Sequence, residues 1–140
     1  MKATSKQQLK NNFQFEAPVM PANTTQNHGI DKVLNVSFNI FELIKNKPED
    51  YFLVRVNGES MIDAGISDGD SLIVNSKISP KENDIVIAQL NGEMLVKRYR
   101  EKEGKLYLIS ANKNFLPIEV FPFEQFSIIG VVKFVIHSMQ

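Results

Sequence analysis

The sequence predicts a mainly β protein of curled antiparallel sheets of short strands, with one short helix and an extended N-terminal arm. Short runs of β-branched and aromatic residues recur between residues 51 and 135, separated by turn residues. The best helical spacing of apolar residues covers residues 37–47. Because residues 1–30 have little hydrophobic periodicity, we expect an arm there and a β domain over residues 31–140.

Composition fits one small globular domain. The chain has 140 residues, of which 43% are hydrophobic and 23% are charged, and this length supports a single core. Its formal net charge is zero, so nothing indicates bulk electrostatic binding to nucleic acid. We therefore expect no direct sequence-specific DNA binding by this chain.

Cysteine content and hydropathy indicate the compartment. The chain has no cysteine, which excludes disulfides and cysteine-ligated metal and suits a reducing compartment. The N-terminus lacks the apolar core of a signal peptide, and there is no run of about 18 apolar residues. We expect a cytoplasmic protein with no membrane contact, no metal and no cofactor.

The arm over residues 1–30 has the composition of a loop. Pro18 and Pro21 break any helix, and a polar run follows them. Phe13 and Phe15 alternate with a polar residue, so they fit an extended strand across an apolar groove as well as a mobile tail. Both interpretations stay open.

The body begins with the helix predicted over residues 37–47. Ile40, Leu43 and Ile44 share one helical face, and Pro48 ends the pattern. The last predicted strand is almost continuously apolar, which favours either a central place in the sheet or a subunit interface. The predicted strands cover residues 51–56, 71–74, 84–90, 93–100, 105–110, 118–120 and 126–135.

Residues 58–70 are rich in Gly and Asp, yet apolar residues interrupt them. Ser60 lies where the first strand of the body ends, and Ser60 and Asp63 fit the spacing of a helix N-cap. This motif predicts one helical turn beginning at Ser60, whose hydroxyl would lie near free backbone N–H groups that can stabilise an oxyanion. The structural alternative is that Ser60 is only a cap.

Lys97 lies in a predicted hairpin with an Asn91-Gly92 turn. Alternation along the second strand puts Leu95, Lys97 and Tyr99 on one face, and Met94, Val96 and Arg98 on the other. Lys97 therefore shares a face with large side chains, which could bury it. The alternative is an exposed edge lysine.

Two other sets of polar residues have weaker support. Asp68 and Asp70 flank Gly69 and most simply build a turn, and they have no third acidic ligand nearby in sequence. His28 and His137 stand in no Ser or Asp context. A Ser-His-Asp triad therefore has no support in the sequence.

Two separated blocks together resemble a known family. The first is Gly-Glu-Ser-Met-Ile-Asp-Ala-Gly-Ile-Ser-Asp-Gly-Asp at residues 58–70, followed by Leu-Ile-Val at 72–74. The second contains Asp-Ile-Val-Ile-Ala, Asn-Gly-Glu and Val-Lys within residues 84–97. In content, order and spacing they resemble the Ser–Lys self-cleaving peptidases of the LexA/UmuD type, with the UmuD mutagenesis proteins as the nearest match.

The resemblance implies a role for each block. Ser60 would be the nucleophile and Lys97 the general base, and the backbone N–H groups of Ser60 and Met61 would hold the oxyanion. It also implies a homodimer of the SOS response that docks on a RecA–single-stranded DNA filament and cuts its own arm. The processed form would be the accessory subunit of an error-prone translesion DNA polymerase.

The arm departs from the family pattern. The family is usually cut at Ala-Gly or Cys-Gly, whereas the only glycine of this arm is Gly29, which follows His28. Either the bond has moved, for example to Glu16-Ala17 or Ala22-Asn23, or the arm is not cut. An arm shorter than the roughly 50 residues of an independent domain favours an UmuD-like accessory protein over a LexA-like repressor.

Three functions follow from these observations. The first is the self-processing accessory protein, and the second is a non-cleaving dimeric binding module of the same fold. The third is a signal-peptidase-like enzyme that acts on other proteins, which the missing membrane anchor disfavours.

Overall fold

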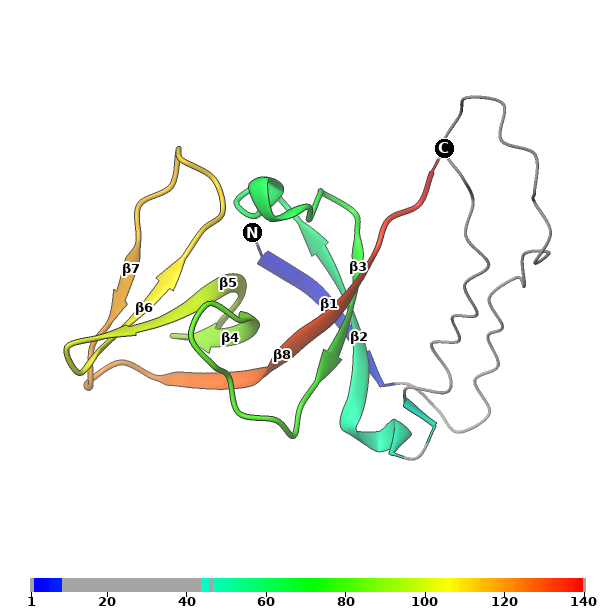
Figure 1. The fold of residues 1–140 in the computed structure, drawn as a ribbon, viewed down its shortest axis with the longest axis horizontal. Helices are drawn as coiled ribbons and strands as arrows, with labels where there is room; N and C mark the ends of the chain where they lie inside the picture. Colours follow the sequence, from blue (N-terminus) through cyan, green and yellow to red (C-terminus); the bar gives the residue numbers. More distant parts are fainter. Residues whose placement is uncertain (1, 9–43, 46, 140) are drawn as a thin grey trace, which may run out of the picture.

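The eight strands of the described residues join one antiparallel sheet in the order β1-β2-β3-β8-β4-β5-β6-β7 (Figure 1). The structure, a computed structural model, describes residues 2–8, 44–45 and 47–139. The strands are β1 (Lys2–Gln8), β2 (Tyr51–Asn57), β3 (Ser71–Asn75), β4 (Ile85–Leu90), β5 (Glu93–Lys102), β6 (Lys105–Ile109), β7 (Ile118–Val120) and β8 (Phe126–Ile136). The predicted mainly β class is confirmed.

The sheet curls until β1 meets β5. Strand β1 pairs along its length with β2, and Lys2 is also the backbone partner of Leu95 in β5. This second pairing closes six strands into a ring, from which β6 and β7 continue outward (Figure 1). The curl predicted from the short, evenly spaced strands is therefore present.

The predicted strands of the body are all present, with ends that differ by at most two residues. Strand β1 was not predicted, because its sequence KATSKQQ has no apolar alternation. Its backbone pairing with β2 supplies what the local pattern lacks. The helix predicted over residues 37–47 lies almost entirely outside the described residues.

Strand β8 is central in the sheet, as one of the two interpretations of its apolar sequence predicted. It pairs with β3 on one side and with β4 on the other. Gly130 allows this close packing: a Cβ there would lie 2.6 Å from a methyl carbon of Val74 and 2.7 Å from the carbonyl oxygen of Asn75. Any larger residue would push β8 away from β3.

The two faces of β5 pack into different clusters of the core. Val96 is buried with Phe52, Leu72 and other residues of one cluster. Leu95 is buried with Val86 and other residues of the second. The predicted alternation of β5 is confirmed, and it leaves Lys97 on the face of Leu95.

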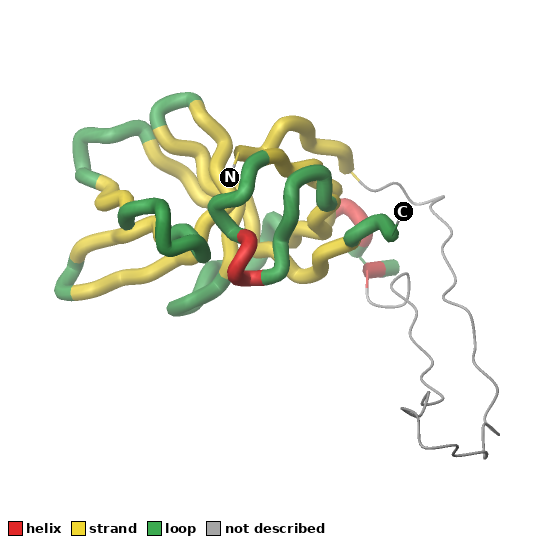
Figure 2. Tube along the Cα trace, turned by 90° about the horizontal axis from the view of Figure 1, so that it is seen from above, coloured by secondary structure: helices red, strands yellow, loops and turns green. Residues whose placement is uncertain are grey.

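Two short 3-10 helices, η1 (Pro48–Asp50) and η2 (Ile62–Ala64), are set between strands and loops (Figure 2). The described residue Ile44 is also helical. Gly65 ends η2 in the left-handed conformation, at φ 81°, which favours glycine. No helix within the described ranges is long and apolar enough to cross a membrane.

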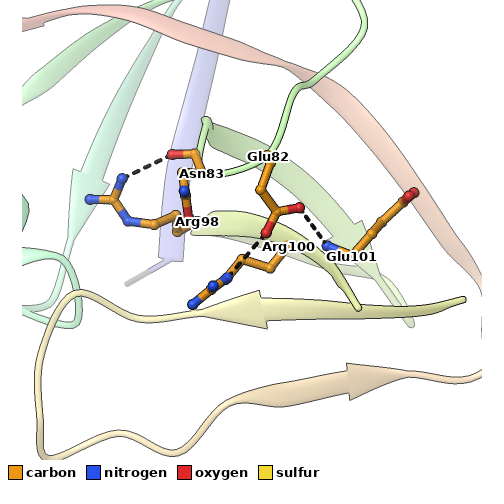
Figure 3. A network of polar contacts seen from close by, with 5 residues as sticks. All are labelled: Glu82, Asn83, Arg98, Arg100 and Glu101. Carbon is orange, nitrogen blue, oxygen red and sulfur yellow. Dashed lines mark hydrogen bonds and ion pairs between the residues drawn. The ribbon is translucent and has the colours of Figure 1, made fainter. Parts of the chain in front are cut away.

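The loop before β4 is fastened to β5 by side-chain contacts (Figure 3). Arg98 donates to the carbonyl oxygen of Asn83 at 2.9 Å, and Arg100 donates to Glu82 at 3.1 Å. The backbone N–H of Glu101 donates to the same Glu82 carboxylate, and this bond is the main reason that the pKa of Glu82 is lowered. Basic residues of the β5–β6 hairpin thus hold its neighbouring loop.

Candidate functional site

The fold brings Ser60 and Lys97 into contact from positions 37 residues apart. The Lys97 amine donates a hydrogen bond to the Ser60 hydroxyl at 3.0 Å. Ser60 is 0% exposed and Lys97 is 4% exposed, so the contact is closed to bulk water on both sides. The two residues that the sequence singled out therefore lie together, and Lys97 is not an exposed edge lysine.

The turn that carries Ser60 is built by its own acidic residues. Asp68 accepts a hydrogen bond from the Gly58 backbone N–H at 2.8 Å, and Asp70 accepts one from the Ser67 backbone N–H at 2.8 Å. Gly58 has φ 95°, a left-handed conformation that glycine adopts without strain. Both aspartates thus have the structural role in the turn that their sequence predicted.

Apolar residues anchor this turn in the core. Met61 and Ile66 are 0% exposed and belong to the same cluster as Phe52 and Val96. Their burial explains why apolar residues interrupt a segment rich in Gly and Asp. Ser60 is held next to Met61, so the position of its hydroxyl is fixed by core packing.

The helix cap predicted at Ser60 is wrong. Helix η2 begins at Ile62, its N-cap is Met61, and no side chain caps it. The Ser60 hydroxyl contacts Lys97 instead of a backbone N–H of the helix. A tertiary contact thus takes the place of the local interaction that the Ser-x-x-Asp spacing predicted.

Burial lowers the pKa of the Lys97 amine, because surroundings of low polarity disfavour the ammonium form. Leu95 and Lys97 line a cavity of about 460 Å³ together with Phe115, whose ring centre lies 5.5 Å from the Lys97 amine. Leu95 was expected to help bury the amine, whereas the contribution of Phe115 was missed. The remaining lining residues are Leu90, Asn91, Glu93 and Ile118.

Ser110 is the second partner of the amine and was also missed. The Lys97 amine donates to the Ser110 hydroxyl at 2.8 Å. The hairpin register could have found it, since Arg98 pairs with Ile109. One further step along both strands sets Ser110 opposite Lys97.

His137 has an acidic partner that its sequence context did not reveal. Its Nδ1 atom lies 2.6 Å from Asp70 Oδ1, in a contact that links the end of β8 to the Ser60 turn. The Asp70 side chain is 2% exposed, whereas that of His137 is 55% exposed. Among the described residues, no group of three or more His, Cys, Asp or Glu could hold a metal ion.

Comparisons with known proteins show the family to which the chain belongs. The family model described as Peptidase S24-like matches residues 17–133. A LexA repressor of Aliivibrio fischeri is 41% identical over 93 residues, covering 66% of this chain and 45% of that protein. A LexA repressor of Hahella chejuensis is 39% identical over 115 residues, covering 72% and 57%.

A LexA repressor of Clostridium kluyveri is 44% identical over 79 residues, covering 56% of this chain and 39% of that protein. The chain thus spans about half the length of the curated relatives it matches. The family match itself covers most of the chain, including both residues of the Ser60–Lys97 contact. The chain belongs to the Peptidase S24-like family, the Ser–Lys peptidases of the LexA/UmuD type.

Proposed function

We propose that this chain is a self-cleaving serine peptidase in which Ser60 is the nucleophile and Lys97 the general base. The observation that carries the proposal is the 3.0 Å contact between a buried hydroxyl and a buried amine. A hydroxyl–amine pair with only a structural role would not need both groups to be buried, because burial of the charged amine costs free energy. A general base needs that burial, because only the neutral amine accepts a proton.

The chemistry follows from the pKa of the amine. A free lysine has a pKa of about 10.4, so almost none of it is neutral at pH 7. Burial lowers this pKa in Lys97 and raises the neutral fraction. The neutral amine would take the Ser60 proton as Oγ attacks a peptide carbonyl, and would then give a proton to the leaving amine. Water would release the acyl-enzyme.

The oxyanion would be held by the backbone N–H groups of Ser60 and Met61. In the described part of the chain, neither N–H donates to another residue. Two donors beside the nucleophile are the usual arrangement for stabilising the negative charge of a tetrahedral intermediate.

The substrate would be the chain's own arm, in cis or from a dimer partner. Strand β1 supports it, because Lys2 pairs with Leu95, two residues from Lys97, so an N-terminal segment already runs beside the site. The bond that is cut would differ from Ala-Gly and Cys-Gly, since the arm contains neither pair. Residues 9–30, where we expect the bond, lie outside the described residues.

Mass spectrometry of the purified protein tests the proposal. The protein is incubated at alkaline pH, where the amine is neutral, and the masses are followed over time. We expect a species that lacks an N-terminal fragment, and none in Ser60→Ala or Lys97→Ala. An unchanged mass after long incubation, with a RecA filament also present, would overturn it.

The second candidate is a non-cleaving dimeric binding module. It is favoured by the arm, which lacks the family's usual cleavage pair. The same incubation separates the two, because the module would keep its full mass while still binding its partners. Sedimentation of the untreated protein tests the homodimer that both candidates share.

There are two candidate roles for this chain within the SOS response, that of a repressor and that of a polymerase accessory subunit. The relatives are LexA repressors, and the resemblance also includes UmuD, the accessory subunit of a translesion polymerase. We propose the UmuD-like role, supported by the zero net charge of this chain. Faster cleavage on a RecA–DNA filament and retention of an error-prone polymerase on the processed protein would support it. Tight binding to operator DNA would instead favour the repressor.

A further inference from the structure

We propose that Ser110 is a positioning residue that holds the Lys97 amine in line with Ser60. The inference rests on the proposed function, since it assigns a partner to the base of that same site. It concerns a residue outside both sequence blocks that carry the family resemblance.

The amine lies between two hydroxyl groups. Lys97 Nζ is 2.8 Å from Ser110 Oγ and 3.0 Å from Ser60 Oγ. Ser110 is half-buried, so its hydroxyl is shielded but not enclosed. The shorter of the two contacts is thus made to the residue that would take no part in bond making.

The segment that carries Ser110 is fixed to the nucleophile turn by its backbone. The carbonyl oxygen of Ala111 accepts from the Asp63 backbone N–H at 2.8 Å, and the Ala111 N–H donates to the Met61 sulfur at 3.3 Å. Asn112 adds a side-chain bond to the carbonyl oxygen of Glu59 at 2.9 Å. Residues 110–112 therefore bond to Lys97 on one side and to the neighbours of Ser60 on the other, and so hold β5 and the nucleophile turn at a fixed separation.

A neutral amine has two N–H bonds and one lone pair, and only the lone pair can accept the Ser60 proton. An acceptor that holds one N–H limits rotation about the Cε–Nζ bond. Ser110 is such an acceptor, so it favours orientations in which the lone pair is free for Ser60. Without it, the amine at the end of a flexible four-carbon side chain would spread over more positions.

Ser110 also affects the protonated amine. A hydroxyl accepts a stronger hydrogen bond from an ammonium than from a neutral amine, so Ser110 keeps the pKa of Lys97 higher than burial alone would. Among the described residues, the charged side chains on elements packed near Lys97 are Glu93 in its cavity and Glu59 and Asp63 on the turn, with Lys2 in the backbone register of β1. A hydrogen bond with the N-terminal amino group also acts on the pKa of Lys97, which it raises. None of them changes when Ser110 is replaced.

The test compares Ser110→Ala and Ser110→Thr with Ser127→Ala, a control at an exposed serine of β8. The rate of self-cleavage is measured against pH in full-length protein. Ser110→Ala should lower the plateau rate by roughly tenfold, less than the ~100-fold expected for a 1 Å misplacement. The midpoint of the pH–rate profile of this variant should move down by about one pH unit, because the Lys97 ammonium loses a hydrogen-bond acceptor. Ser110→Thr should restore both, and Ser127→Ala should change neither.

A merely structural role for Ser110 would lower the melting temperature and leave the midpoint unmoved, which would overturn the inference. A wild-type midpoint and plateau in Ser110→Ala would overturn it as well. If the wild-type protein does not cleave at all, the proposed function fails, and the positioning role of Ser110 is then tested on the pKa of the Lys97 amine. NMR titration of the lysine side chains then gives the Lys97 pKa, which Ser110→Ala must lower; an unchanged pKa rejects the positioning role.

Discussion

The turn over residues 58–70 makes two polar contacts with distant strands, and only one of them is closed on both sides. Ser60 meets Lys97 of β5 at 3.0 Å, with both residues buried. Asp70 meets His137 at the end of β8 at 2.6 Å, and the histidine side chain is 55% exposed. Enclosure on both sides changes the proton affinity of a group, whereas an exposed partner stays screened by water. The first contact therefore suits chemistry, and the second suits anchoring of the turn.

The largest effect should come from Lys97→Ala, which removes the proposed general base from the enclosed contact. We expect self-cleavage to fall by about 10²–10⁴-fold, the usual contribution of a general base. Intact mass spectrometry at alkaline pH measures the rate. Lys77→Ala, at an exposed lysine, is the matched control and should cleave like the wild type. Cleavage by Lys97→Ala at the wild-type rate would remove the distinction between the two contacts.

The pH dependence should also belong to the enclosed contact. Below the pKa of Lys97 the rate should rise by about tenfold per pH unit, because the neutral amine is the active form. The midpoint should lie below about 10.4, the value of a free lysine, since burial lowers the pKa of Lys97. A midpoint at or above that value would contradict the assignment.

The free energy of unfolding should also depend on the titration of Lys97. Between the lowered pKa in the folded state and about 10.4 in the unfolded state, the unfolded chain binds more protons. The contribution of Lys97 to the free energy of unfolding therefore rises with pH through that window. Urea unfolding at several pH values measures it, and Lys97→Met should lose this part of the pH dependence.

Asp70→Ala tests the anchoring contact from its buried side. The Ser67 backbone N–H and His137 would both lose their acceptor. We expect a loss of about 1.5–3 kcal/mol in the free energy of unfolding, the usual contribution of hydrogen bonds to a charged group. The midpoint of the pH–rate profile should stay in place, since Asp70 does not contact the amine. A shifted midpoint would mean that the two contacts are coupled.

His137→Ala tests the same contact from its exposed side and should have the smallest effect. A contact whose partner is mostly exposed contributes less than about 1 kcal/mol, and the Ser67 N–H keeps its acceptor in this variant. Thermal unfolding measures the change, with Ser138→Ala, the exposed neighbour, as the control. A loss as large as that of Asp70→Ala would show that the histidine holds the turn by itself.

Most of the fold could be predicted from the sequence because its signals are local. Strand β7 was predicted at its observed bounds, and alternation along β5 correctly placed Lys97 with Leu95. Strand β1 was missed, since a polar segment becomes a strand here only through its pairing with β2. The Ser60 cap was wrong for a related reason: a contact 37 residues away replaced the local one.

The candidate site could be predicted only as far as its motifs reach. Ser60 and Lys97 stand in recognisable blocks, whereas Ser110 becomes visible only when the hairpin register is carried past Ile109. The pairing of His137 with Asp70 spans 67 residues and has no local signal. Such contacts depend on how strands order themselves in the sheet, and the central position of β8 was itself an open alternative.

The pairing of β1 with both β2 and β5 has a consequence for the processed protein. A cut after this strand would leave it attached to the sheet through hydrogen bonds alone, as a separate short peptide. Dissociation of this peptide would open the ring of strands and leave the backbone edges of β2 and β5 unpaired there. Such edges can pair with a strand from another chain. Self-cleavage would then shorten the chain and also expose, beside the Ser60–Lys97 contact, sheet edges with which a strand of another chain could pair.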